Sequence, residues 1–236
     1  MALDPMHAAE TSSPLPPRYR LFVFDLDGTL ADSFPFFVAS QRRLAALHGF
    51  RPIMEEDVET LRGWAPRQLM RHTRLPFWKL PRVARDFRRL MEAEGHAITC
   101  FPGVHDALHH LHAAGVQLAL VSSNSVQNCR RVLGPRTWGL LSHVECGASL
   151  FGKARRLKRT CRTLGHAPGD VIYVGDQTTD AEAARRAGVA FGAVAWGYAT
   201  PESLARCAPD VFVEDVRALA TLGTPPLAKP SHRQGR

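Results

Sequence analysis

The run from Leu21 to Leu30 constrains the fold most, because an apolar segment ends abruptly in two carboxylates, a glycine and a hydroxyl. Residues 21–24 are all apolar, which is typical of a strand buried on both faces of a parallel sheet. Asp25 and Asp27 follow at once. In sheets of this kind ligands bind beyond the carboxyl ends of the strands. The sequence therefore predicts a buried strand that delivers two carboxylates to a binding site.

Apolar segments of the same kind recur along the chain, with amphipathic helical segments between them. Strands are expected near residues 21–25, 117–122, 143–146, 171–175, 190–195 and 211–213. This alternation predicts an α/β fold built on a doubly wound parallel sheet.

Residues 33–98 break the alternation, because they show helical periodicity and no convincing strand. Apolar residues recur there at helical spacing, as in Val83, Phe87 and Leu90. The segment is therefore expected to be an all-α insertion, with hinges near residues 31–33 and 98–102. The expected layout is a core of residues 19–32 and 99–222 with a helical cap of residues 33–98. The proline-containing ends, residues 1–18 and 223–236, are expected to be disordered tails.

Polar groups follow the other strands as well. Asp25 and Asp27 repel each other unless a cation lies between them, and oxygen ligands of this kind favour Mg²⁺. Ser122, Ser123 and Asn124 follow the strand near 117–122. Two further acidic residues, Asp176 and Asp180, follow the strand near 171–175, and Lys153 opens a basic helix.

The run Asp25-Leu-Asp27-Gly-Thr-Leu-Ala-Asp-Ser resembles the signature of the haloacid dehalogenase (HAD) superfamily, in its phosphoglycolate phosphatase-like branch. Further matches occur in the family's order at Ser122, at Lys153 and at Gly175-Asp176, and together they span roughly residues 19–215. The resemblance implies a Rossmann-like core, a Mg²⁺ cofactor, and a helical cap that closes over the active site and contacts the substrate.

The expected chemistry is phosphoryl transfer. Asp25 can attack phosphorus to give an aspartyl-phosphate, and Asp27 can protonate the leaving group and then deprotonate water. The resemblance implies that the backbone carbonyl of Asp27, rather than its carboxylate, binds the metal. Dehalogenases of the superfamily lack the second Asp, so its presence favours phosphoryl chemistry.

The remaining site residues are expected to hold the phosphoryl group and the metal. Ser122 and Lys153 are expected to act in catalysis, and Asp176 to complete the metal site. Asp180 either assists the metal or orients Lys153. Ser123 is an alternative to Ser122, because strand alternation directs only one of the two hydroxyls toward the site. The expected phosphate-binding residues are Thr29, Ser122, Ser123, Asn124 and Lys153.

Charged and aromatic residues in the helical insertion are candidates for substrate specificity, and packing within the cap is an equally good explanation for them. They are Arg62, Trp64, Arg67, Trp78 and Lys79.

The net charge of +8 suits an anionic partner but does not identify one. The basic run at residues 155–159 has no aromatic residues for base stacking, which disfavours nucleic acid. No stretch approaches the ~18 to 20 apolar residues of a membrane helix. The five cysteines form no C-x-x-C pair and are expected to be reduced thiols of a cytoplasmic protein.

These features together predict a Mg²⁺-dependent phosphatase that hydrolyses a small phosphomonoester, such as a phosphoglycolate-like compound, a sugar phosphate or a nucleotide. The alternatives are a phosphomutase of the same fold and a non-catalytic regulator that binds a phosphorylated ligand.

Overall fold

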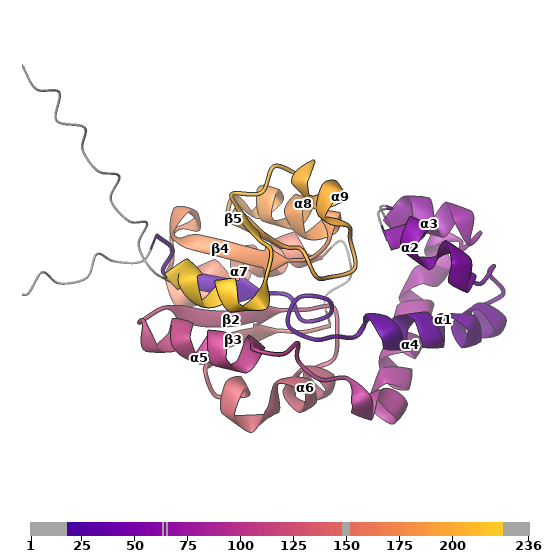
Figure 1. The fold of residues 1–236 in the computed structure, drawn as a ribbon, viewed down its shortest axis with the longest axis horizontal. Coiled ribbons are helices and arrows are strands. Elements are labelled where there is room, and N and C mark those ends of the chain that lie inside the picture. Colours follow the sequence, from indigo (N-terminus) through magenta and orange to yellow (C-terminus); the bar gives the residue numbers. More distant parts are fainter. Residues whose placement is uncertain (1–17, 63, 65, 148–151, 224–236) are drawn as a thin grey trace, which may run out of the picture.

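The protein has a six-stranded parallel sheet with strand order β3-β2-β1-β4-β5-β6, seen in a computed structural model that describes residues 18–62, 64, 66–147 and 152–223 (Figure 1). The strands are β1 (Leu21–Phe24), β2 (Gln117–Val121), β3 (Leu141–Glu145), β4 (Val171–Gly175), β5 (Ala190–Val194) and β6 (Val211–Val213). The α/β fold class and the predicted strands are confirmed, with β3 beginning slightly earlier than expected.

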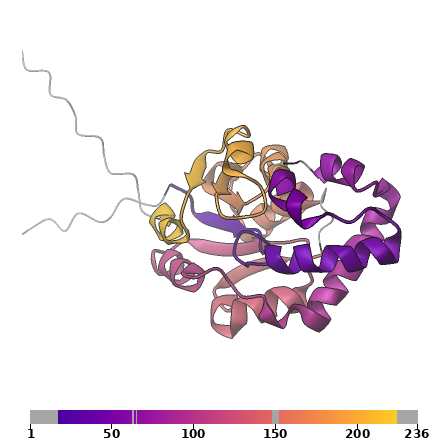
Figure 2. The ribbon, with the colours of Figure 1, turned by 45° about the vertical axis from the view of Figure 1, so that its right-hand side comes forward.

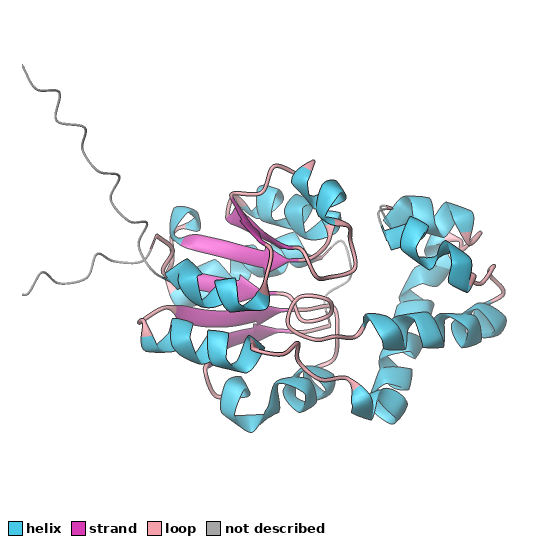
Figure 3. Cartoon of the chain, in the orientation of Figure 1, coloured by secondary structure: helices cyan, strands magenta, loops and turns pink. Residues whose placement is uncertain are grey.

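Helices cover both faces of the sheet (Figures 2 and 3). One face packs against α5 (Val104–Ala113), α6 (Val126–Trp138) and the 3₁₀ helix η5 (Val216–Gly223). The other packs against α7 (Lys153–Leu164), α8 (Thr178–Ala187) and α9 (Pro201–Ala205), and the short η4 (Pro168–Asp170) precedes β4. Phe22 and Phe24 of β1 face the first layer, whereas Leu21 and Val23 face the second. This double burial explains why β1 is apolar throughout.

The register of the central strands aligns their carboxyl ends. Phe24 of β1 is paired with Leu120 of β2 on one side and with Val174 of β4 on the other. The residues that follow these strands therefore emerge at one edge of the sheet. These are the residues in which the sequence places its polar motifs.

The segment between β1 and α5 consists of helices and loops in its described part, and it forms a body beside the carboxyl edge of the sheet (Figure 3). Its elements are α1 (Phe34–His48), η1 (Glu55–Asp57), α2 (Val58–Arg62), α3 (Pro66–His72), η2 (Phe77–Lys79), α4 (Leu80–Glu94) and η3 (Gly95–Ala97). Helix α1 has a proline in its first turn and ends at Gly49 in the left-handed conformation, with φ of 66°. The helical content agrees with the predicted cap.

The chain enters and leaves this helical cap at adjacent points. The Asp32 amide donates a hydrogen bond of 3.0 Å to the Thr99 carbonyl, and the Phe101 amide donates one of 2.9 Å to the Leu30 carbonyl. The predicted hinges therefore lie side by side.

The predicted tails fall almost wholly outside the described residues. Residues 1–17 and 224–236 are not described. Within the part of the chain that is described, no helix has the length and apolar character needed to cross a membrane. The exact domain limits stay a prediction.

Candidate active site

Lys153 joins two carboxylates that are far apart in the sequence. Asp25 follows β1, Lys153 is the first residue of α7, and Asp180 lies in the first turn of α8. The Nζ atom of Lys153 lies 2.6 Å from Asp25 Oδ2 and 2.7 Å from Asp180 Oδ1, and all three side chains are buried. The structure thus brings these three predicted residues into direct contact.

The charges within this group change the pKa values of Lys153 and Asp25. Burial works against the ammonium form of Lys153, but Asp180 and Asp25 outweigh it and raise the pKa of Lys153 well above its usual value. Burial raises the pKa of Asp25 to about 7, although the neighbouring Lys153 opposes this shift.

Asp176 is fixed by contacts on both of its oxygens. The Thr29 hydroxyl donates a hydrogen bond of 3.0 Å to Oδ1, and the Tyr198 amide donates one of 2.8 Å to Oδ2. Gly28 and Gly197 pack so closely that an added Cβ would lie 2.1 Å and 2.2 Å from atoms of this side chain. Burial, followed by repulsion from the other carboxylates, raises the pKa of Asp176 well above its usual range.

Asp25, Asp176 and Asp180 form a buried cluster whose candidate ligand oxygens lie within 4.8 Å of one another. Among the described residues, Asp25 Oδ1 has no hydrogen-bond partner although it is buried. An all-oxygen donor set with an unsatisfied carboxylate oxygen fits a hard divalent cation such as Mg²⁺.

Asp180 also has an orienting role in the fold. The Gln177 amide donates to Asp180 Oδ2 at 3.1 Å, as part of a capping box that starts α8. The Tyr173 hydroxyl donates to Asp180 Oδ1 at 3.1 Å. Asp180 therefore both contacts Lys153 directly and belongs to the carboxylate cluster.

Asp27 is held by the segment that follows β2. Asn124 Nδ2 donates a hydrogen bond of 2.9 Å to Asp27 Oδ2, and Asn128 in turn donates to Asn124 Oδ1 at 2.8 Å. Asp27 Oδ1 is buried without a hydrogen-bond partner in the described part of the chain. Burial raises the pKa of Asp27 above its usual value, which favours a protonated carboxyl.

The two serines after β2 have different surroundings. Ser122 is fully buried, and its hydroxyl accepts a hydrogen bond of 3.1 Å from the Asn124 amide. Ser123 is half-buried, and its carbonyl accepts a hydrogen bond of 3.2 Å from Arg88 of α4. The assignment of the phosphate-binding hydroxyl stays a prediction.

Among the cap candidates, Arg62 reaches the core. Its Nη2 atom donates a hydrogen bond of 2.6 Å to the Gly197 carbonyl, and its guanidinium lies 4.6 Å from the centre of the Phe34 ring.

The other cap candidates have contacts within the cap or face solvent. The Trp64 ring packs edge-on against His72 at 5.3 Å, and Arg67 is exposed. Trp78 is 77% exposed, and Lys79 donates a hydrogen bond of 2.7 Å to the His48 carbonyl at the end of α1. These placements favour packing or solvent contact for these residues.

Tyr198 is a residue of this region that the sequence motifs do not identify. Its hydroxyl lies 2.9 Å from Ser33 Oγ, and its ring packs at 5.0 Å against Phe34. Its amide donates a hydrogen bond to Asp176, so Tyr198 connects the start of the cap, at Ser33 and Phe34, to the carboxylate cluster. The only sequence signal is an aromatic residue shortly after an apolar strand.

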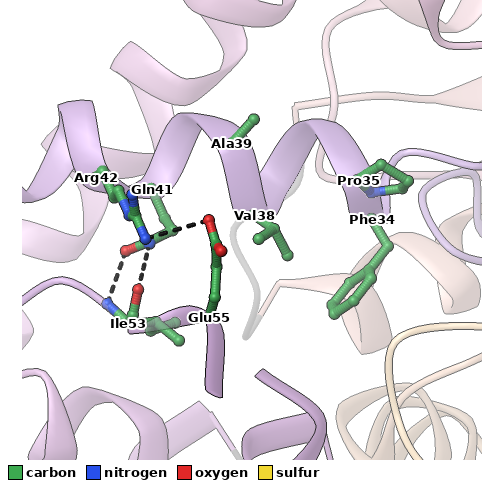
Figure 4. A pocket seen from close by; sticks show the side chains of 8 residues that line it. All are labelled: Phe34, Pro35, Val38, Ala39, Gln41, Arg42, Ile53 and Glu55. Carbon is green, nitrogen blue, oxygen red and sulfur yellow. Dashed lines mark hydrogen bonds and ion pairs between the residues drawn. The ribbon is translucent and has the colours of Figure 1, made fainter. Parts of the chain in front are cut away.

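A cavity of about 430 Å³ lies within the cap, between α1 and residues 53–55 (Figure 4). Its lining is largely apolar, and Arg42 forms an ion pair of 3.3 Å with Glu55 at one end. The cavity is not lined by the cluster of Asp25, Asp176 and Asp180, nor by Asp27 or Lys153. Phe34 lines it and also contacts Tyr198, so the cavity and the carboxylate site share one neighbour.

Known proteins resemble this chain over most of its length. Residues 22–194 match the model of the haloacid dehalogenase-like hydrolase family. A phosphoglycolate phosphatase of Synechococcus elongatus is 38% identical over 195 residues, which cover 81% of this chain and 91% of that protein. A tyrosine-protein kinase of Mycobacterium tuberculosis is 33% identical over 190 residues, which cover 76% of this chain and 63% of that protein.

The fold has a close match among solved structures. A haloacid dehalogenase-like family hydrolase from Streptococcus pneumoniae superimposes with a TM-score of 0.70 at 21% identity, over 86% of this chain and 98% of that chain. This likeness supports the fold alone. The resemblance noted in the sequence is confirmed by the family match and by the relatives. The chain therefore belongs to the haloacid dehalogenase-like hydrolase family, as an enzyme of its phosphatase type.

Proposed function

We propose that the protein is a Mg²⁺-dependent phosphatase that hydrolyses a small phosphomonoester through an aspartyl-phosphate on Asp25. The observation that carries the proposal is the buried cluster of Asp25, Asp176 and Asp180 around Lys153, at the carboxyl edge of the sheet. Family membership supports the same chemistry.

Asp25, Asp176 and Asp180 would hold the metal, together with the Asp27 carbonyl that the family resemblance implies. A bound Mg²⁺ would offset the negative charge of the phosphoryl oxygens and of the clustered carboxylates. Without it, burial and, to a smaller extent, repulsion between the carboxylates favour the protonated form, as the raised pKa values of Asp25 and Asp176 indicate.

Asp25 acts as the nucleophile. Lys153 donates a hydrogen bond to Oδ2 and so holds the carboxylate in place for attack on phosphorus. A bond forms between Asp25 and phosphorus while the bond from phosphorus to the leaving oxygen breaks. Lys153 is buried and charged, so it also attracts the phosphoryl oxygens to this position.

Asp27 moves the protons of both steps. Asn124 anchors Oδ2, and Oδ1 stays available for the substrate. The protonated carboxyl donates its proton to the leaving alkoxide. The resulting carboxylate then takes a proton from a water molecule that attacks phosphorus, and the bond from phosphorus to Asp25 breaks. The products are an alcohol and inorganic phosphate.

The substrate is proposed to be small and anionic, and a phosphoglycolate-like compound is the first choice because a relative at 38% identity is a phosphoglycolate phosphatase. Sugar phosphates and nucleotides are the other substrate classes to test. Arg62 is the cap side chain best placed to affect the choice, since it reaches the loop beside Asp176.

The test is phosphate release from a panel of phosphomonoesters, with and without Mg²⁺, for the wild type and Asp25→Asn. We expect release that requires Mg²⁺ and an inactive but folded Asp25→Asn protein. Activity retained in that variant would overturn the mechanism. A phosphomutase would instead move phosphate between positions of a sugar without releasing it, and a regulator would bind a phosphorylated ligand unchanged.

A further inference from the structure

Cys129 and Cys146 form a pair of thiols close to the candidate active site. Cys129 lies in α6 and is fully buried, whereas Cys146 directly follows β3 and is half-buried. Their sulfur atoms lie 3.5 Å apart and share a hydrogen bond. Both are free thiols, and the proposed phosphatase chemistry uses neither.

The surroundings make Cys146 the more reactive thiol. When Cys146 is ionised, Cys129 can donate its S–H to the thiolate, and the Arg156 guanidinium adds a favourable charge. Both effects lower the pKa of Cys146 and outweigh its partial burial. The same hydrogen bond, together with burial, raises the pKa of Cys129. A half-buried thiol of this kind is the type that peroxides oxidise first.

The pair is connected to the residues that hold Asp27. The Gly147 amide, next to Cys146, donates a hydrogen bond of 2.7 Å to the Asn124 carbonyl. The Cys129 amide donates one of 3.0 Å to the Ser125 carbonyl. Asn124 is therefore hydrogen-bonded to the residue after Cys146 and directly precedes Ser125, which is hydrogen-bonded to Cys129. The side chain of Asn124 donates a hydrogen bond to Asp27.

We propose that Cys129 and Cys146 are a modification site at which a hydroperoxide generates a reversible disulfide that slows turnover. The effect on turnover rests on the proposed phosphatase function. Formation of the bond does not.

The chemistry needs two steps and one hydroperoxide. The Cys146 thiolate attacks one peroxide oxygen, so that an S–O bond forms, the O–O bond breaks and the departing oxygen is protonated. The Cys129 sulfur then attacks Cys146, an S–S bond forms, and hydroxide leaves with the Cys129 proton as water. The two sulfurs together lose two electrons, which the peroxide gains.

The bond would require the sulfurs to approach from 3.5 Å to roughly 2.05 Å. This movement pulls the end of β3 toward α6. The Gly147 to Asn124 hydrogen bond couples the movement to Asn124, and so to the position of the Asp27 carboxyl. If the Asp27 carboxyl is displaced in this way, the proton transfers proposed for Asp27 become slower.

The test compares the wild type with Cys146→Ser, Cys129→Ser and Cys207→Ser, each treated with hydrogen peroxide after full reduction. Cys207 is the matched control, because it is also half-buried but contacts the Ser203 carbonyl, and burial raises its pKa. Intact mass and peptide mapping measure the bond. Phosphate release before and after dithiothreitol measures its effect.

We expect the wild type and Cys207→Ser to lose about two mass units through a bond between residues 129 and 146. Their phosphate release should fall several-fold and recover after reduction, whereas the other two variants should keep their activity. Absence of the bond, or a bond between other cysteines, would overturn the site. A disulfide that forms but leaves phosphate release unchanged would contradict the proposed effect on turnover. If no form releases phosphate, the proposed function fails, and the mass data still decide whether the site exists.

Discussion

Arg62 of the cap donates a hydrogen bond of 2.6 Å to the backbone carbonyl of Gly197 in the core. Gly197 packs directly against the side chain of Asp176, where an added Cβ would lie 2.2 Å from the Asp176 Cβ. A cap residue thus contacts the loop that packs against the carboxylate cluster, so the cap and the cluster are joined through Gly197.

Replacing Arg62 by alanine should lower kcat/KM by about tenfold to a hundredfold, which corresponds to the loss of a hydrogen bond from a charged donor. Arg67→Ala is the matched control, since Arg67 is exposed on the neighbouring helix. Steady-state kinetics on the best substrate of the panel measure both. Equal effects of the two substitutions would show that general cap charge, and not this contact, matters.

A methyl group at Gly197 should damage the site without placing strain on the backbone. Gly197→Ala forces a contact with Asp176, and overpacking of this kind costs about 1–3 kcal/mol. Gly169→Ala serves as the control, because no atom lies within 4 Å of an added Cβ there. Thermal unfolding and Mg²⁺ titration of activity should show a loss for the first variant. An unchanged Mg²⁺ requirement in Gly197→Ala would contradict the role given to this loop.

The stability of the metal-free protein should fall as the pH rises from about 4 through about 7. Burial raises the pKa of Asp25 to about 7 in the folded chain, so the folded state retains protons that the unfolded state has lost. Above that pH the ionised carboxylates repel one another, and Mg²⁺ relieves this repulsion. The gain in Tm on adding Mg²⁺ should therefore be larger near pH 8 than near pH 5.

Differential scanning fluorimetry at both pH values measures this gain. Asp176→Asn should abolish most of it, because the variant removes one member of the cluster. A gain of the same size at both pH values would argue against these carboxylates as the cation site.

Asp27→Asn should slow turnover by about 10²- to 10⁴-fold, the range expected for loss of a general acid and base. Since Asp25 is intact, the covalent intermediate should accumulate with a reactive substrate and add about 80 mass units to the protein. Rapid-quench mass spectrometry detects it, and Asp25→Asn provides the blank. Full activity in Asp27→Asn would exclude the proposed proton transfers.

The residues at the ends of the strands could be predicted from the sequence, for a simple geometric reason. The buried strands can be recognised in the sequence by their continuous apolar runs, and the carboxyl ends of parallel strands in register lie at the same edge of the sheet. Asp25 and Asp176 therefore had to lie at the same edge. The position of Lys153 in the site could be predicted only from the family resemblance. The residues around Lys153 indicate that a helix begins there, but they do not show which distant side chains it contacts.

Contacts between cap and core could not be predicted, because they depend on how two bodies are oriented. Arg62, Trp78 and Lys79 look alike as charged or aromatic cap residues, yet Arg62 reaches Gly197 while Lys79 binds the end of α1.

The contact of Thr29 could not be predicted from the sequence either. It lies in the phosphate motif, but its hydroxyl donates to Asp176, a residue that is distant in sequence. The proximity of Cys129 to Cys146 likewise arises only from the packing of α6 beside β3.

The adjacent entry and exit of the helical insertion have a consequence for how such an enzyme can change. Asp32 and Thr99 are joined by a backbone hydrogen bond of 3.0 Å, so the chain leaves the core and returns to it at neighbouring positions. The length and sequence of the insertion can vary without moving the strands that carry Asp25 and Asp176. If the proposed function is correct, related enzymes could differ in this insertion and in their substrates while the strand ends that carry the proposed chemistry stay in place.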